Sequence, residues 1–130
     1  MVKYNMVTDQ PAIIRFDPGG VVEDYMARER SFELKGKKIV IDGRCASACT
    51  LYTRSPDLCV TSRAAFYFHE AADGKDEDHL VGRDPEVTAS MMSFYPQRIS
   101  DWIKSKGGLR RHMLVLRGRE MLSYFKLCKS

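Results

Sequence analysis

The sequence has 130 residues and a mass of 14.9 kDa, which suits one domain spanning residues 1–130 and excludes a large multi-site enzyme. Lys and Arg number 21 against 17 Asp and Glu, and the two signs are interspersed, so the net charge of +4 does not indicate nucleic-acid binding. There is no apolar run of about 18 residues, so no membrane span is expected.

The first half of the sequence alternates between strand and helix patterns. An apolar run predicts a strand over 12–16, and the turn signal at 17–20 ends it. Apolar residues three and four apart predict a helix over 21–32, followed by a β-branched strand over 38–42 that Gly43 and Arg44 interrupt. Small residues from position 45 open a short helix that must stop before Pro56.

The second half continues with two strands and longer helices. Strands are predicted over 58–61 and 64–69, then a polar loop over 70–84 that carries six acidic residues and is expected to be mobile. A helix over 85–106 should begin at its proline and bend at Pro96, and an apolar segment at 113–116 precedes a last helical stretch over 118–125. This order predicts an α/β layered domain with a mainly parallel sheet and flanking helices.

Two turns stand out as places where a ligand could approach the backbone. The turn with Gly19 and Gly20 follows the first strand, and Ser47 follows the second, flanked by Ala46 and Ala48. Both should lie at the carboxyl edge of the sheet, where helix N-termini offer unpaired N–H groups to an oxyanion. Ser47 taken alone is an ordinary helix cap, but the small neighbours also suit an exposed nucleophile on a sharp strand-to-helix turn.

His69 ends the most strand-like run of the chain, 22 residues after Ser47. If its strand runs parallel to the one before Ser47, the imidazole lies at the same edge and can act as general base. The alternative interpretation is a strand-end histidine bonded to a nearby carbonyl.

Three segments together carry a resemblance: 17–20 (Asp-Pro-Gly-Gly), 43–49 (Gly-Arg-Cys-Ala-Ser-Ala-Cys) and 66–69 (Phe-Tyr-Phe-His). They resemble the caseinolytic-protease (ClpP)/crotonase superfamily, and more closely a group of uncharacterised bacterial proteins often predicted to be periplasmic. Gly107-Gly108-Leu109 and the late Cys128 are similar to features of that group, and the resemblance covers roughly residues 12–128.

The resemblance implies a ClpP/crotonase-like fold and a serine hydrolase, most simply a peptidase, acting on a peptide or small acyl substrate. Ser47 would be the nucleophile and His69 the general base, and the backbone N–H groups of Gly20 and Ala48 would form the oxyanion hole. This chemistry needs neither cofactor nor metal. Many relatives are oligomers built through a helix like the one at 85–106, so the resemblance leaves a homo-oligomer open.

One departure from the family keeps other functions open. The peptidase branch supplies an acidic third residue after the histidine, whereas residues 106–111 contain no carboxylate; Asp101 falls in a helix and Glu120 lies past the expected place. A Ser–His dyad is one solution, and a non-catalytic ClpP-like binding or assembly module is the alternative. An acyl-thioester enzyme of the crotonase branch would not need Ser47.

Four cysteines, at 45, 49, 59 and 128, are compatible with two disulfides and an oxidising compartment, and the resemblance implies the periplasm. Because the N-terminal residues lack the apolar core of a signal peptide, a cytoplasmic location also remains open.

Helical geometry turns Cys49 away from Ser47 into the fold, which favours the pairs Cys49–Cys59 and Cys45–Cys128. A Cys₃His zinc site formed by the first three cysteines and His69 is the rival interpretation.

Overall fold

The computed structural model describes residues 10–71 and 84–129. In chain order these residues form the following elements: β1 (Ala12–Asp17), α2 (Val22–Lys35), β2 (Ile39–Ala46), the 3₁₀ helix η1 (Ser47–Arg54), β3 (Leu58–Val60), β4 (Ala65–Phe68), α3 (Pro85–Phe94), α4 (Gln97–Ser105), β5 (Leu114–Arg117), α5 (Gly118–Met121) and β6 (Lys126–Leu127).

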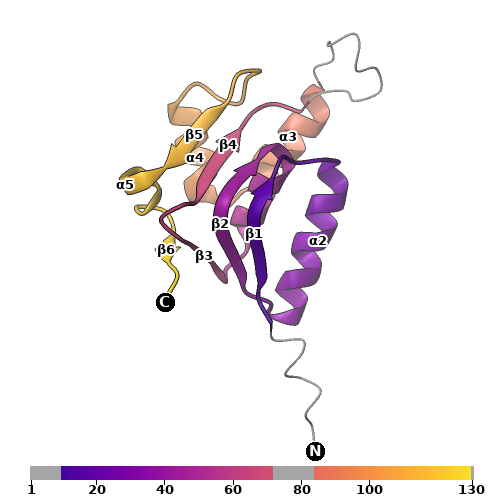
Figure 1. Cartoon of the computed structure of the whole chain (residues 1–130). Coiled ribbons are helices and arrows are strands. Elements are labelled where there is room, and N and C mark those ends of the chain that lie inside the picture. The colour runs from indigo at the N-terminus through magenta and orange to yellow at the C-terminus, as the bar shows by residue number, and fades with distance from the viewer. Residues whose placement is uncertain (1–9, 72–83, 130) are drawn as a thin grey trace, which may run out of the picture.

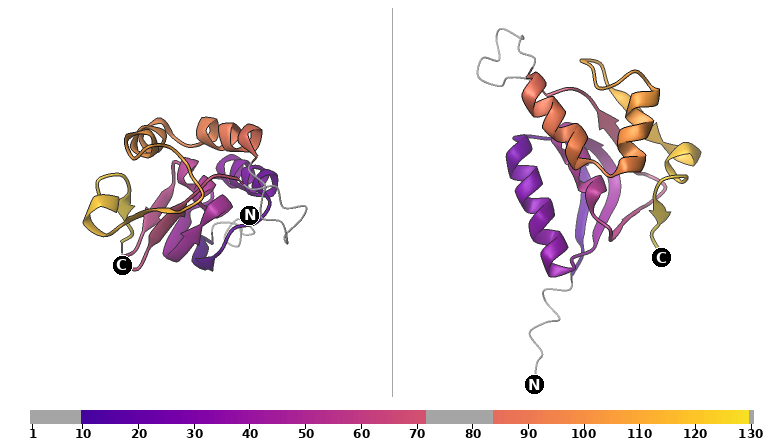
Figure 2. Two further views of the ribbon diagram at one scale, coloured as in Figure 1. Left: turned by 90° about the horizontal axis from the view of Figure 1, so that it is seen from above. Right: turned by 180° about the vertical axis from the view of Figure 1, so that it is seen from behind.

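The sheet is organised around β2. Strand β1 runs parallel along one side of β2, while β3 and β4 share its other side, β3 beside 39–41 and β4 beside 44–46, both parallel. Beyond them, β6 is parallel to β3 and β5 is antiparallel to β4, so the described sheet is mixed. Helices α2, α3 and α4 lie on one side of this curled sheet (Figures 1 and 2).

The core fills the space between the sheet and the helices. Alternate strand residues point toward the helices, so Phe66 and Phe68 of β4 are fully buried while their neighbour Tyr67 is not. The Phe68 ring lies 5.5 Å from the rings of both Tyr95 and Trp102, which joins the sheet to the end of α3 and to α4. These contacts fix the position of the strand end that carries His69.

Strand β2 contains a bulge at Gly43. Ile14 pairs with Ile41 but Phe16 pairs with Arg44, so one extra residue is accommodated in β2. A Cβ on Gly43 would overlap the carbonyl oxygen of Arg15, so only glycine fits this approach of the two strands. The glycine therefore bends the strand without ending it.

The structure confirms an α/β domain with flanking helices and corrects several details. The strand predicted over 38–42 continues to Ala46, and the antiparallel β4–β5 pair was not predicted. The helix predicted over 85–106 is two helices separated at Tyr95 and Pro96, and the last helix ends at Met121. Of the polar loop, residues 72–83 lie outside the described residues, so its predicted mobility is not tested.

Two disulfides are present, as the cysteine count indicated, but the predicted pairing is wrong. The bonds are Cys45–Cys49 and Cys59–Cys128. Cys45, one residue before the end of β2, has its side chain on the core side, beside Phe66, where Cys49 of η1 meets it. Cys128 is brought to Cys59 because β6 pairs with β3, and the N–H of Cys128 donates to the carbonyl of Val60 at 2.8 Å.

Candidate functional site

The two turns singled out in the sequence meet at one edge of the sheet. Gly19 has φ +98°, a conformation that favours glycine, and a Cβ built there would lie 2.6 Å from the Cβ of Ser47. The same position lies 2.8 Å from the carbonyl oxygen of Ala46 and 3.0 Å from the Ala48 nitrogen. The turn after β1 therefore packs directly against the strand end that carries Ser47.

Asp17 and Tyr25, which the sequence analysis did not select for their side chains, hold this turn. One carboxylate oxygen of Asp17 accepts from the Gly19 N–H at 2.9 Å and from the Tyr25 hydroxyl at 2.7 Å. Burial and the hydrogen bond to Asp17 raise the pKa of Tyr25 to about 12, so the phenol stays protonated and keeps donating. An Asp two residues before a Gly is the sequence signal that could have indicated this turn.

Since Asp17 engages the Gly19 N–H, the next amide along is the one available to a ligand. The Gly20 N–H has no partner within the described part of the chain. Ala48 is the second residue of η1, and the first N–H groups of such a helix lack intrahelical acceptors. The two amides predicted as oxyanion donors thus belong to segments that are in contact.

Ser47 has a left-handed backbone, with φ +58°, and no other non-glycine residue of the described ranges has a positive φ. Such a conformation costs about 1–3 kcal/mol and persists only where the surroundings enforce it. The carbonyl of Ser47 accepts from the Thr50 hydroxyl at 2.6 Å, and Thr50 also bonds the buried Tyr95 hydroxyl at 2.7 Å. The core thereby fixes the turn, and the Ser47 side chain remains half-buried between Ala46 and Ala48.

The Cys45–Cys49 disulfide spans this turn. Its Cα atoms are 5.3 Å apart and both cysteines are fully buried, so the bond crosses beneath Ser47 from the end of β2 to the first turn of η1. The bond therefore restrains both ends of the segment that holds Ser47 in its left-handed conformation.

His69 follows β4, which is parallel to β2 as its predicted position required. Ala46 pairs with Tyr67, so Ser47 comes one residue and His69 two residues after a paired position on adjacent strands, which lie about 4.8 Å apart. Among the described residues no hydrogen bond joins the two side chains. The His69 Nδ1 lies 2.8 Å from the Glu70 carbonyl oxygen, which can only accept, so in neutral His69 Nδ1 carries the proton and Nε2 has a free lone pair.

The segment after α4 does reach this histidine, but with its backbone. The Arg110 carbonyl accepts from the Glu70 N–H at 2.8 Å, and this bond helps to hold Glu70, the residue whose own carbonyl orients His69. The two acids considered from the sequence are engaged elsewhere, Asp101 with Gln97 and Glu120 with the Trp102 indole at 2.9 Å. A backbone carbonyl therefore occupies the position at Nδ1 where a triad has its acid.

The zinc interpretation is wrong. All four cysteine sulfurs are tied up in disulfides and cannot act as thiolate ligands. Within residues 10–71 and 84–129, no group of three or more His, Cys, Asp or Glu side chains is placed to hold a metal ion.

Two hollows flank helix α3, and the sequence analysis did not anticipate them. One, of about 450 Å³, begins at Glu70 beside His69 and is lined further by Asp84, Pro85, Thr88, Ala89 and Leu109.

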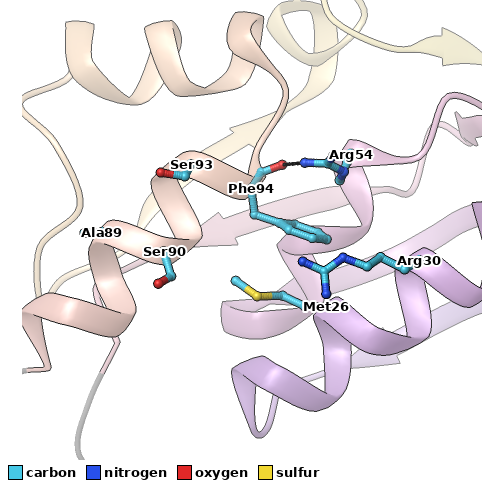
Figure 3. Close-up of a pocket in the computed structure, with 7 residues that line it drawn as sticks. All are labelled: Met26, Arg30, Arg54, Ala89, Ser90, Ser93 and Phe94. Carbon is cyan, nitrogen blue, oxygen red and sulfur yellow. Dashed lines mark hydrogen bonds between the residues drawn. The ribbon is translucent and has the colours of Figure 1, made fainter.

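The other, of about 460 Å³, lies between α2 and α3 (Figure 3). In the second, Arg54 donates to the Phe94 carbonyl at 3.1 Å, and the guanidinium groups of Arg54 and Arg30 lie 4.6 and 5.4 Å from the Phe94 ring centroid.

Behind Arg54, helix α2 buries a carboxyl group. Glu29 is 0% exposed and neither of its oxygens has a hydrogen-bond partner among residues 10–71 and 84–129, although the Arg54 Nε lies 3.9 Å away. Burial, and then the neighbouring Glu33, raise the pKa of Glu29 to about 8. The folded protein therefore takes up a proton here that the unfolded chain, with a glutamate pKa of about 4.3, has already lost at neutral pH.

Glu29→Gln should raise stability at high pH. Because the folded-state pKa lies above the unfolded one, the native protein loses stability as pH rises from about 4.3 to about 8. The neutral, isosteric glutamine removes this penalty. Urea denaturation should therefore show a larger free energy of unfolding for the variant than for the wild type at pH 9, and the difference should shrink toward pH 5. Glu23→Gln, on the first turn of the same helix, is the matched control and should not change the pH dependence. Equal effects at pH 5 and pH 9 would contradict the buried-acid explanation.

The fold and this edge define an α/β domain in which a left-handed serine, two contacting turns and a strand-end histidine share one edge of a mixed sheet. The sequence matches no family model and no curated protein. A solved structure named only "Crystal structure of an Enzyme" is similar in fold, with a TM-score of 0.54, 6% sequence identity, and 93% of this chain and 78% of that chain covered. No helix of the described ranges is long and apolar enough to cross a membrane.

Proposed function

We propose that this protein is a serine hydrolase, acting on a peptide or small acyl substrate, in which Ser47 is the nucleophile and His69 the general base. The observation that carries the proposal is the left-handed backbone of Ser47. A non-glycine residue in this strained conformation, on a sharp turn from a strand into a helix, is the arrangement that exposes a nucleophilic hydroxyl.

In the proposed reaction the Ser47 Oγ attacks the substrate carbonyl carbon and its proton passes to Nε2 of His69. The negative charge that develops on the carbonyl oxygen is stabilised by the N–H groups of Gly20 and Ala48. His69 then gives the proton to the leaving group, and water releases the acyl group from Ser47. The Glu70 carbonyl supports this cycle by keeping the lone pair on Nε2, although it stabilises the imidazolium less than a carboxylate would.

A ClpP/crotonase-like fold is part of this proposal, since that superfamily places a Gly-Gly turn against a Ser turn as seen here. The hollow that begins at Glu70 is adjacent to His69 and is partly apolar, which suits the side chain or acyl group of a substrate. Two disulfides, one of them beneath Ser47, are compatible with an extracytoplasmic protein, and we propose the periplasm.

The second candidate is a non-catalytic binding or assembly module with the same fold. Two observations favour it: the Ser47 hydroxyl and His69 are not hydrogen-bonded to each other, and no carboxylate of the described residues bonds Nδ1. Catalytic hydrogen bonds frequently tighten only when substrate is bound, so a reactivity measurement decides between the two candidates.

A fluorophosphonate probe provides that measurement. The oxidised wild-type protein should be labelled, and mass spectrometry should locate the label on Ser47. Ser47→Ala should abolish labelling, and His69→Ala should slow it by about 10²–10⁴-fold, the contribution of a general base. Ser123→Ala, on the surface far along the chain, is the control. Absence of labelling in the folded wild type would establish the non-catalytic module, and labelling that persists in Ser47→Ala would identify another nucleophile.

A further inference from the structure

The sheet face opposite the helices carries a row of long basic side chains around a small residue. Arg44 of β2, Ala65 of β4 and Arg117 of β5 are partners across adjacent strands. Their side chains point away from the core because a neighbour of each along its strand, Cys45, Phe66 or Leu116, is buried. Ala65 therefore forms the floor between two arginines.

This floor lies in a groove of about 550 Å³, the size of a small-ligand site. Four of the residues that line the groove are arginines. These are Arg15, Arg44, Arg63 and Arg117, and Asp42 lines the groove with them. Ser47 and His69 do not line the groove, so it is separate from the site proposed above.

Asp42 holds two of the four arginines in place. Its carboxylate, in a residue only 8% exposed, accepts from Arg63 Nε at 3.1 Å and Nη2 at 3.0 Å, and Arg15 lies at 3.5 Å. The hydrogen bonds from Arg63 and Thr61 hold the pKa of Asp42 below its usual range, so the carboxylate stays charged. The side chains of Arg63 and Arg15 nevertheless remain 72% and 70% exposed.

The other two arginines have no carboxylate partner in the described part of the chain. The Arg44 guanidinium lies over the Tyr67 ring, 4.2 Å from its centroid, and both residues line the groove. Four arginines and one carboxylate thus line the groove, an excess of three positive charges. Such an excess is self-repulsive unless an anion neutralises it.

We propose that this groove binds a small ligand carrying at least two oxyanion groups, phosphate or carboxylate. Arginine donors are planar forks that match both groups bidentately, and their separation across Ala65 allows two groups to be held at once. Gly43 and Gly118 line the groove without side chains, so the ligand can approach the backbone at both ends of the arginine row.

Isothermal titration calorimetry at low ionic strength, with inorganic pyrophosphate and with citrate as probes, tests the proposal. At least one probe should bind, more weakly as KCl is added, and should shift the backbone amide resonances of Gly43 and Gly118. Tighter binding of pyrophosphate would identify a phosphate-bearing ligand, and tighter binding of citrate a carboxylate-bearing one.

Arg44→Gln combined with Arg117→Gln should weaken binding about tenfold or more, because it removes the two guanidinium groups that have no carboxylate partner among the described residues. Lys104→Gln on α4, which covers the other face of the sheet, removes a positive charge elsewhere and should change affinity less than about twofold. Absence of binding by both probes, or an equal loss in the Lys104 variant, would overturn the proposal.

Discussion

Gly19→Ala should destabilise the protein by at least about 3 kcal/mol and slow fluorophosphonate labelling by at least about 100-fold. The added Cβ would lie 2.6 Å from the Ser47 Cβ and 2.8 Å from the Ala46 carbonyl oxygen, at a φ of +98°. To relieve this overlap the turn must move away from η1, which separates the Gly20 and Ala48 amides. Urea denaturation and labelling rates measure the two effects.

Gly108→Ala is the matched control. Gly108 has a similar φ of +88°, but no atom lies within 4 Å of the Cβ that alanine would add. This variant therefore measures the conformational penalty alone, about 1 kcal/mol, and should leave the labelling rate unchanged. If the two variants behave alike, the contact between the turn and Ser47 is not important for the site.

Removing the Cys59–Cys128 disulfide, with both cysteines changed to alanine, should cost about 4 kcal/mol. The bond joins residues 69 apart, so in the chain-entropy model its loss releases a large loop in the unfolded chain. It also frees β6, whose two residues pair only with β3 in the described sheet. Urea denaturation without reductant measures the loss.

The second disulfide offers a direct comparison. Cys45 and Cys49 are only 4 residues apart, so the same double replacement there should cost about 2 kcal/mol by loop entropy. Its larger effect should be on labelling, because the bond restrains the turn that carries Ser47. A greater stability loss for the short loop than for the long one would show that loop entropy does not govern these bonds.

Local sequence signals were sufficient for most of the fold. Three elements formed near their predicted positions: the strand before Asp17, the helix after Gly20 and the strand before His69. In each of them the sequence pattern places apolar residues on the side that faces the core. Pro96 separated two helices as its missing N–H required. Gly43 misled the prediction because a glycine that allows a bulge is indistinguishable, in sequence, from one that ends a strand.

Pairing across the sheet was beyond those signals. The antiparallel β5 and the two-residue β6 depend on long-range hydrogen bonds that short apolar segments do not specify. The cysteine pairing failed for this reason, because Cys128 reaches Cys59 only through β6. The predicted position of His69 requires β4 to run parallel to β2, and this direction is confirmed.

For the candidate site, the sequence indicated the residues that meet at the edge but not how they are held. Gly19 contacts Ser47 as the paired turns implied. Asp17 and Thr50 support the turns through hydrogen bonds with the backbone, and Tyr25 supports them through the Asp17 carboxylate. Polar side chains at these positions could equally well have faced solvent, so the sequence does not reveal these bonds. The roles of Ser47 and His69 themselves remain predictions for the labelling experiment.

The irregular pairing of β1 with β2 determines what would have to be copied to rebuild this turn in another protein. Ile14 faces the core, yet Phe16, two residues on, pairs with the outward Arg44 and is 68% exposed. Regular pairing would direct Phe16 inward and Asp17 outward, and the Asp17 carboxylate would no longer reach Gly19 and Tyr25. Grafting the Gly-Gly and Cys-Ala-Ser-Ala-Cys segments onto a regular parallel sheet should therefore fail unless Gly43 and its bulge are transplanted with them.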